Sequence, residues 1–168
     1  MKVMQETRRR IIELLRIQGG QTVRDLTASL RLTRTGVINH LAALQAAADK
    51  FATLFVGHYA AVKGYMAAAF ANNFKGNPAL KKAAVDRLVK NADDIAVFVS
   101  SANPNLPKAT VYGLLLTHGQ QHLMAIDAAA KKDWAGEADM WDPMVKHIYT
   151  ISDALAGGIA KQFPDKFQ

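Results

Sequence analysis

The stretch over residues 22–45, TVRDLTASLRLTRTGVINHLAALQ, constrains the fold most, because its apolar residues recur every three or four positions instead of alternating. The residues that would share the buried face are Val23, Leu26, Leu30, Val37, Leu41 and Leu44. Thr22 and Thr33 precede the two halves of this pattern, where a hydroxyl group caps a helix, and Asp25 gives the first half a capping-box-like start. Two short helices joined by a corner at Leu32 are therefore predicted.

A further helix is expected before this stretch, and no β-hairpin is expected after it. Apolar residues at helical spacing predict a helix over residues 6–18, which Gly19 and Gly20 end. Residues 46–73 are rich in alanine and contain no hairpin signal. Three helices without a following β-wing are the predicted N-terminal arrangement.

The remainder of the chain also has helical spacing. Four longer helices with short loops are predicted over residues 51–73, 78–101, 107–132 and 137–163, with prolines at several of the boundaries. Short loops favour antiparallel neighbours. The predicted fold class is all-α, with a three-helix helix-turn-helix at residues 1–45 followed by an antiparallel four-helix bundle at residues 46–168.

Positive charge is concentrated at the N-terminal end. Residues 1–45 hold eight Lys and Arg against three Asp and Glu, a net charge of +5, while the remaining residues hold thirteen against eleven, a net charge of +2. Only one of the eight arginines, Arg87, lies beyond residue 45. Guanidinium groups bind phosphates, which supply most of the non-specific affinity for nucleic acid. The first module is thus either a nucleic-acid-binding unit or a unit with a solvated basic face.

The sequence TRRRIIELLRIQGGQTVRDLTASLRLTRTGVINHLAALQ, over residues 7–45, resembles the helix-turn-helix of winged-helix repressors of the arsenical-repressor and deoxyribonucleoside-repressor types. Its counterpart there has the form T-V-x-x-L-A-x-x-L-x-L-[ST]-x-[ST]-x-V-x-x-H-L-x-x-L. The resemblance implies duplex DNA as a partner. The DNA-binding residues expected on this basis are Thr22, Thr33, Arg34, Thr35, Asn39 and His40. The missing wing is a departure, and a three-helix packing unit that touches no DNA is the alternative.

The C-terminal part resembles a different group, a bacterial family of helical-bundle proteins described mostly as hypothetical. The matching phrases are NADDIAVFV at residues 91–99, Asn103-Pro104, His118 and GIAKQFPDKF at residues 158–167. Two departures are Thr117, which stands where that family has a glutamate before the histidine, and the helix-turn-helix, which replaces its N-terminal helices. The resemblance implies a helical bundle and no particular activity.

Several histidines of the predicted bundle are candidate metal ligands. His118 and His122 are four residues apart, so they stand on one face of a helix and are able to hold one ion. His58 lies on an apolar helix face and is expected to point inward, and Asp94 offers a carboxylate. The predicted ligand set for a metal ion or a heme is therefore His58, Asp94, His118 and His122. Ordinary core or surface histidines are the alternative.

Other classes of function find little support. The chain has no cysteine, no Gly-rich phosphate loop and no nucleophile elbow, so an enzyme is not expected. It also contains no apolar run long enough for a membrane span and no signal peptide, which predicts a cytoplasmic protein with no membrane partner.

The functional prediction is a DNA-binding transcriptional regulator with a helical dimerisation or effector domain. A homodimer is expected because one helix-turn-helix buries little surface on DNA. Apolar residues at Met66, Phe70, Trp134 and Trp141 are candidates for the dimer interface or for a ligand pocket. The alternative is a helical bundle that binds a metal, a heme or a small apolar ligand and does not touch DNA.

Overall fold

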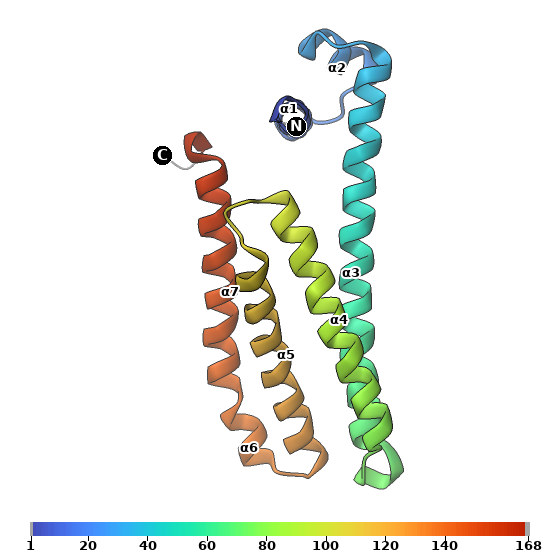
Figure 1. The fold of residues 1–168 in the computed structure, drawn as a ribbon, viewed down its shortest axis with the longest axis vertical. Coiled ribbons are helices and arrows are strands. Elements are labelled where there is room, and N and C mark those ends of the chain that lie inside the picture. Colours follow the sequence, from blue (N-terminus) through green and yellow to red (C-terminus); the bar gives the residue numbers. More distant parts are fainter. Residues whose placement is uncertain (1, 167–168) are drawn as a thin grey trace. The chain divides into compact units, whose positions relative to one another are not determined.

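The structure is a computed structural model that describes residues 2–166, a range in which every regular element is helical (Figure 1). The elements are α1 Lys2–Gln18, α2 Val23–Leu30, α3 Arg34–Phe74, α4 Pro78–Ala102, α5 Lys108–Ala130, α6 Trp134–Asp139, α7 Trp141–Gln162 and the 3-10 helix η1 Pro164–Lys166. The all-α prediction is confirmed, and no strand of a wing follows the third helix within residues 2–166. The chain forms two compact units, Met1–Ala52 and Thr53–Gln168, whose boundary lies inside α3.

The first unit has a hydrophobic core of its own. Ile11 of α1, Leu26 of α2 and Val37 of α3 are 0–1% exposed and contact one another at its centre. The partly buried residues packed around them are Leu14, Leu15, Val23, Leu30, Leu32, Leu41 and Leu44. The buried face predicted from the helical spacing is therefore confirmed.

Both predicted caps are present in the first unit. Thr22 forms a full capping box with Asp25, in which each side chain accepts a hydrogen bond from the other residue's backbone N–H. The Thr33 hydroxyl accepts from the Gly36 backbone N–H at 3.1 Å and so starts α3. Arg31 ends α2 in the left-handed conformation, at φ 53°, and its backbone N–H donates to the Thr27 carbonyl. These contacts define the corner between α2 and α3.

The third helix is much longer than predicted. The sequence pattern suggested one helix ending near residue 45 and another starting at Phe51, but α3 continues through this stretch. Residues 42–50 contain no glycine or proline and include five alanines, which favour helix most strongly. The helix becomes irregular only at its end, where Asn72 and Asn73 adopt positive φ.

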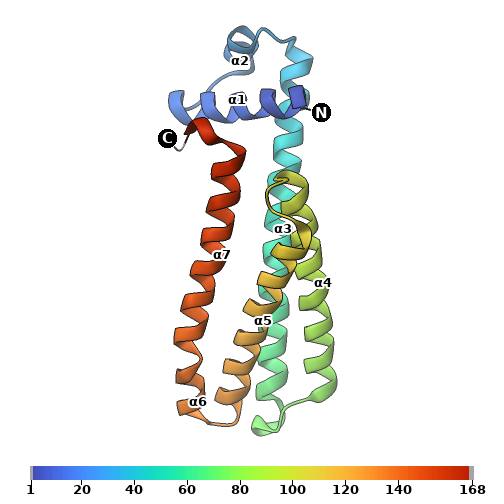
Figure 2. The ribbon, with the colours of Figure 1, turned by 60° about the vertical axis from the view of Figure 1, so that its left-hand side comes forward.

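The second unit contains the predicted four-helix bundle, formed by the later part of α3 with α4, α5 and α7 (Figures 1 and 2). Short connections make successive long helices antiparallel. The last predicted helix is interrupted at Met140, so the short α6 precedes α7. No helix within residues 2–166 is long and apolar enough to cross a membrane.

Two apolar clusters fill the bundle near its opposite ends. One, beside the α3–α4 turn, is built on Tyr65, Ala69, Ala84 and Ala130. The other, beside the α4–α5 connection, is built on Ala96, Leu106 and Val111. At this second end α7 approaches so closely that a Cβ added to Gly158 would stand 2.6 Å from Cγ of Leu106. Glycine at this position therefore allows the close packing.

Candidate nucleic-acid interface and histidine layer

The start of α3 exposes a polar and cationic surface. Arg34, Thr35 and Asn39 are all exposed, whereas His40 is half-buried on the side nearer the core. Ile38 lies between them and is 43% exposed, although it is a large apolar residue. An exposed asparagine and an apolar side chain at the N-terminal end of a recognition helix match the chemistry of adenine edges and thymine methyl groups.

Thr22 and Thr33 have structural roles besides the DNA contact predicted for them. The Thr22 hydroxyl donates to the Asp25 carboxylate at 2.6 Å and accepts from the Asp25 backbone N–H. Its donor and its acceptor are therefore both used in the helix cap. The Thr33 hydroxyl accepts from Gly36 and keeps its own O–H for another partner. Of the two, Thr33 is the better placed to donate to a phosphate.

A concavity lies where α2 and α3 begin. It has a volume of about 430 Å³ and is lined by Thr22, Val23, Arg24, Thr27 and Arg34. Among the described residues, neither Arg24 nor Arg34 has a carboxylate within ion-pair distance. Two available guanidinium groups beside the N-terminus of a helix suit a phosphate.

Sequence reasoning left Arg24 and Ile38 out of the predicted contact set. Arg24 was counted only as part of the basic charge, and its position beside Arg34 depends on the corner between the helices. Ile38 is apolar and so gave no polar signal. Its place one residue after buried Val37 indicates exposure, since consecutive residues on a helix point about 100° apart.

Three histidines of the second unit lie close together in the middle of the bundle, and a fourth acts on two of them electrostatically. The ring centroids of His118 and His122 are 4.6 Å apart, and those of His118 and His147 are 6.3 Å apart. His58 of α3 is near enough to act electrostatically on both histidines of α5. We call His58, His118, His122 and His147 the histidine layer. Sequence reasoning missed His147, because spacing along the chain does not reveal a neighbour on another helix.

Burial keeps part of this layer neutral. The pKa of His118 is lowered to about 4, first by burial and then by the neighbouring His122, His58 and His147. The pKa of His122 is lowered by burial and by His58. At neutral pH both imidazoles of α5 are therefore unprotonated and retain a nitrogen lone pair.

Asp94, the fourth ligand predicted from the sequence, takes part in a different interaction. Its carboxylate accepts from the Lys90 ammonium at 2.7 Å, one turn earlier on α4. The α4 residue that contacts the layer is Asn91, whose side-chain oxygen is 3.1 Å from Nδ1 of His58. As the side chains stand, no three His, Asp or Glu residues of the described chain are arranged to hold a metal ion.

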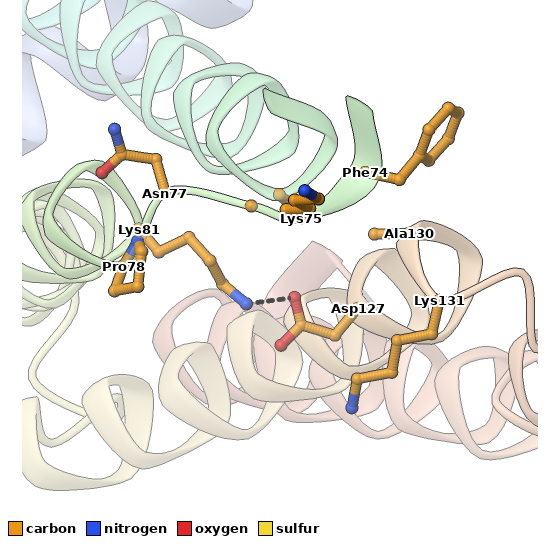
Figure 3. Close-up of a pocket in the computed structure, with 10 residues that line it drawn as sticks. Phe74, Lys75, Asn77, Pro78, Lys81, Asp127, Ala130 and Lys131 are labelled. Atoms are coloured by element: carbon orange, nitrogen blue, oxygen red, sulfur yellow. Dashed lines mark hydrogen bonds and ion pairs between the residues drawn. The ribbon is translucent and has the colours of Figure 1, made fainter. Parts of the chain in front are cut away.

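A second concavity, of about 340 Å³, lies beside the α3–α4 turn and is lined in part by Lys81 and Asp127 (Figure 3). Figure 3 shows the Lys81 ammonium directed at the Asp127 carboxylate. The ion pair between them is 2.6 Å long. The Tyr65 hydroxyl donates to the other oxygen of the same carboxylate at 3.0 Å. These groups satisfy one another across α3, α4 and α5, so the network ties the helices together rather than offering a free binding group.

Comparison with known proteins identifies the first unit. Residues 5–47 match the family model described as bacterial regulatory protein, arsR family. The match covers α1, α2 and the start of α3, so the N-terminal helix-turn-helix of arsR repressor type predicted from the sequence is confirmed. No curated protein and no solved structure matches the chain.

Proposed function

We propose that this protein is a DNA-binding transcriptional regulator whose first unit reads duplex DNA and whose bundle joins two copies. The observation that carries the proposal is the match of residues 5–47 to arsR-family regulators, in a unit whose recognition helix exposes Arg34, Thr35 and Asn39. A regulator of this kind acts by binding and needs no catalytic residue. Since its target is chromosomal DNA, the cytoplasmic location expected from the sequence is part of it.

The proposed contacts divide by chemistry. Arg24 and Arg34 bind phosphates beside the start of α2, and the free O–H of Thr33 supports them. Asn39 and Ile38 meet base edges in the major groove, where an amide pairs with adenine and an apolar group contacts the thymine methyl. Thr22 acts indirectly, by capping α2.

A homodimer follows from the small size of one helix-turn-helix and from an exposed face of α7. Large apolar side chains recur there at helical spacing, and all are 43–65% exposed: Trp141, Val145, Ile148, Tyr149 and Ile159. We call this set the α7 stripe. Exposed apolar side chains that gather on one face of a helix typically mark a protein interface. We propose that it packs against a second copy, with the recognition helices about 34 Å apart or a multiple of that distance.

The DNA contacts are tested by measuring the affinity for random duplex at several salt concentrations. Affinity should fall steeply as salt rises, and Arg34→Ala or Arg24→Ala should each flatten the log–log slope by about one unit, the loss of one phosphate contact. Arg87→Ala is the matched control, because Arg87 is exposed and belongs to the bundle unit. Absent affinity at low salt, or an equal loss with Arg87→Ala, would reject the proposed interface.

The dimer is tested separately by light scattering. Ile148→Glu introduces a charge into the α7 stripe and should shift the molecular mass from two copies to one, while Asp153→Ala on the same helix should not. A wild-type monomer at micromolar concentration would reject the dimer without affecting the DNA-binding test.

A further inference from the structure

The histidine layer is a polar section in the middle of the bundle. It lies between the cluster built on Tyr65 and Ala69 and the cluster built on Ala96 and Leu106. Its members come from three helices: His58 from α3, the pair from α5, and His147 from α7. Imidazoles in the middle of a bundle are not needed for packing, since aliphatic side chains would fill the same space at lower desolvation cost.

Hydrogen bonds set the tautomers of two of these histidines. The Asn91 side-chain N–H donates to the Leu54 carbonyl at 2.9 Å, so its oxygen is left to accept from the Nδ1–H of His58. Nε2 of His58 therefore carries a lone pair. His147 donates from Nε2 to the Leu114 carbonyl at 2.9 Å, which leaves a lone pair on Nδ1. Carbonyl and amide partners of this kind orient metal-binding histidines in proteins.

A third histidine has an unsatisfied nitrogen. Nδ1 of His118 is buried and has no hydrogen-bond partner. Buried polar atoms of folded proteins are nearly always paired, so an unpaired imidazole nitrogen at this position is open to a partner from solution. The neighbouring groups in this layer are imidazoles with nitrogen lone pairs of their own. A cation can bind several such lone pairs, whereas another hydrogen-bond acceptor can bind none of them.

We propose that the histidine layer binds one divalent transition-metal ion, represented by Zn²⁺, through imidazole nitrogens of His58, His118, His122 and His147. Imidazole favours zinc, copper and nickel over calcium and magnesium, which prefer oxygen ligands. Two imidazoles on one zinc, with Zn–N near 2.0–2.1 Å, have ring centroids roughly 5 Å apart. The observed 4.6 Å between His118 and His122 lies close to this separation, whereas the 6.3 Å between His118 and His147 is longer.

Binding of one ion requires two of the rings to turn, because no three ligands of the described residues are arranged to hold an ion as they stand. His118 and His122 are half-buried and neither ring is held by a hydrogen bond among the described residues, so both can turn about the broad terminal torsion of a histidine. Four neutral imidazoles leave the positive charge of the ion uncompensated. Because the side chains are partly exposed, water can reach the ion and stabilise that charge.

The experiment uses the untagged full chain, stripped with chelator and titrated with Zn²⁺ by calorimetry and with Co²⁺ by absorbance. The expected result is one ion per chain, with visible Co²⁺ bands of a nitrogen-ligated site. His118→Gln and His122→Gln should each weaken binding by more than about tenfold, since even a lost second-shell partner costs that much. Asn91→Ala, which removes only a positioning residue, should weaken it less.

His40→Gln is the chemically matched control for metal binding, because His40 is the one histidine of the first unit. It should leave the stoichiometry and the affinity for Zn²⁺ unchanged. The proposal is overturned if the wild-type chain takes up no stoichiometric Zn²⁺ or Co²⁺, or if the His118 and His122 variants bind as tightly as the wild type. None of these readouts involves DNA, so they stand or fall independently of the proposed regulatory function.

Discussion

Two adjacent glycines of α7 differ in what surrounds them. A Cβ at Gly158 would collide with buried Leu106, whereas a Cβ at Gly157 would meet no atom within 4 Å. Gly158→Ala should therefore destabilise the bundle by about 1–3 kcal/mol through overpacking. Gly157→Ala should stabilise it by about 0.5–1 kcal/mol through helix propensity. Urea unfolding followed by tryptophan fluorescence measures both, and equal effects of the two variants would contradict the close contact.

His118 predicts a pH dependence of stability in the metal-free protein. Its pKa in the folded chain is about 4, below the ordinary 6.5, so between these values the unfolded chain binds a proton that the folded chain does not. The stability contributed by neutral His118 is thus complete above pH 6.5 and is lost as pH falls toward 4. The urea midpoint should decrease between about pH 7.5 and about pH 5 in the presence of chelator, and His118→Gln should reduce that decrease. An unchanged pH profile in the variant would show that other groups cause it.

At the scale of the helices, α2 depends strongly on its cap because it has only eight residues. Thr22→Ala removes the capping box and should cost about 1 kcal/mol locally, which corresponds to roughly fivefold faster amide exchange over α2. Thr22→Ser keeps the hydroxyl and should exchange at the wild-type rate. Hydrogen exchange measured by mass spectrometry separates the two, and matching rates in Thr22→Ala and Thr22→Ser would show that the cap does not hold α2.

Local signals made most helices predictable. Caps, glycines and apolar spacing are encoded within a few residues, so the end of α1, the bounds of α2 and the start of α3 agree with their predicted positions, although α1 begins at Lys2 and not near residue 6. The break expected before Phe51 was wrong because no breaking residue stands there. Asp94 was chosen as a ligand from its neighbour in sequence, but adjacent helical residues point in different directions, and Lys90 pairs with it. Finding His147 required the packing of α5 against α7, which no local pattern contains.

At the scale of the whole molecule, each unit has a core of its own. Ile11, Leu26 and Val37 fill the first, and the clusters around Tyr65 and Leu106 fill the second. A chain with separate cores need not unfold in one cooperative step. A ligand raises the stability only of the part that binds it, so duplex DNA should stabilise the first unit and Zn²⁺ the second.

The two units also differ in their chromophores. Both tryptophans, Trp134 and Trp141, and all four tyrosines lie within the second unit, while the first has neither residue. Intrinsic fluorescence therefore reports on the bundle alone, and far-ultraviolet circular dichroism reports on both units. On heating, the dichroism should show a transition that the fluorescence does not record, and adding Zn²⁺ should move the fluorescence curve. Superimposable curves from the two probes would mean that the helix-turn-helix and the bundle unfold together in one cooperative transition.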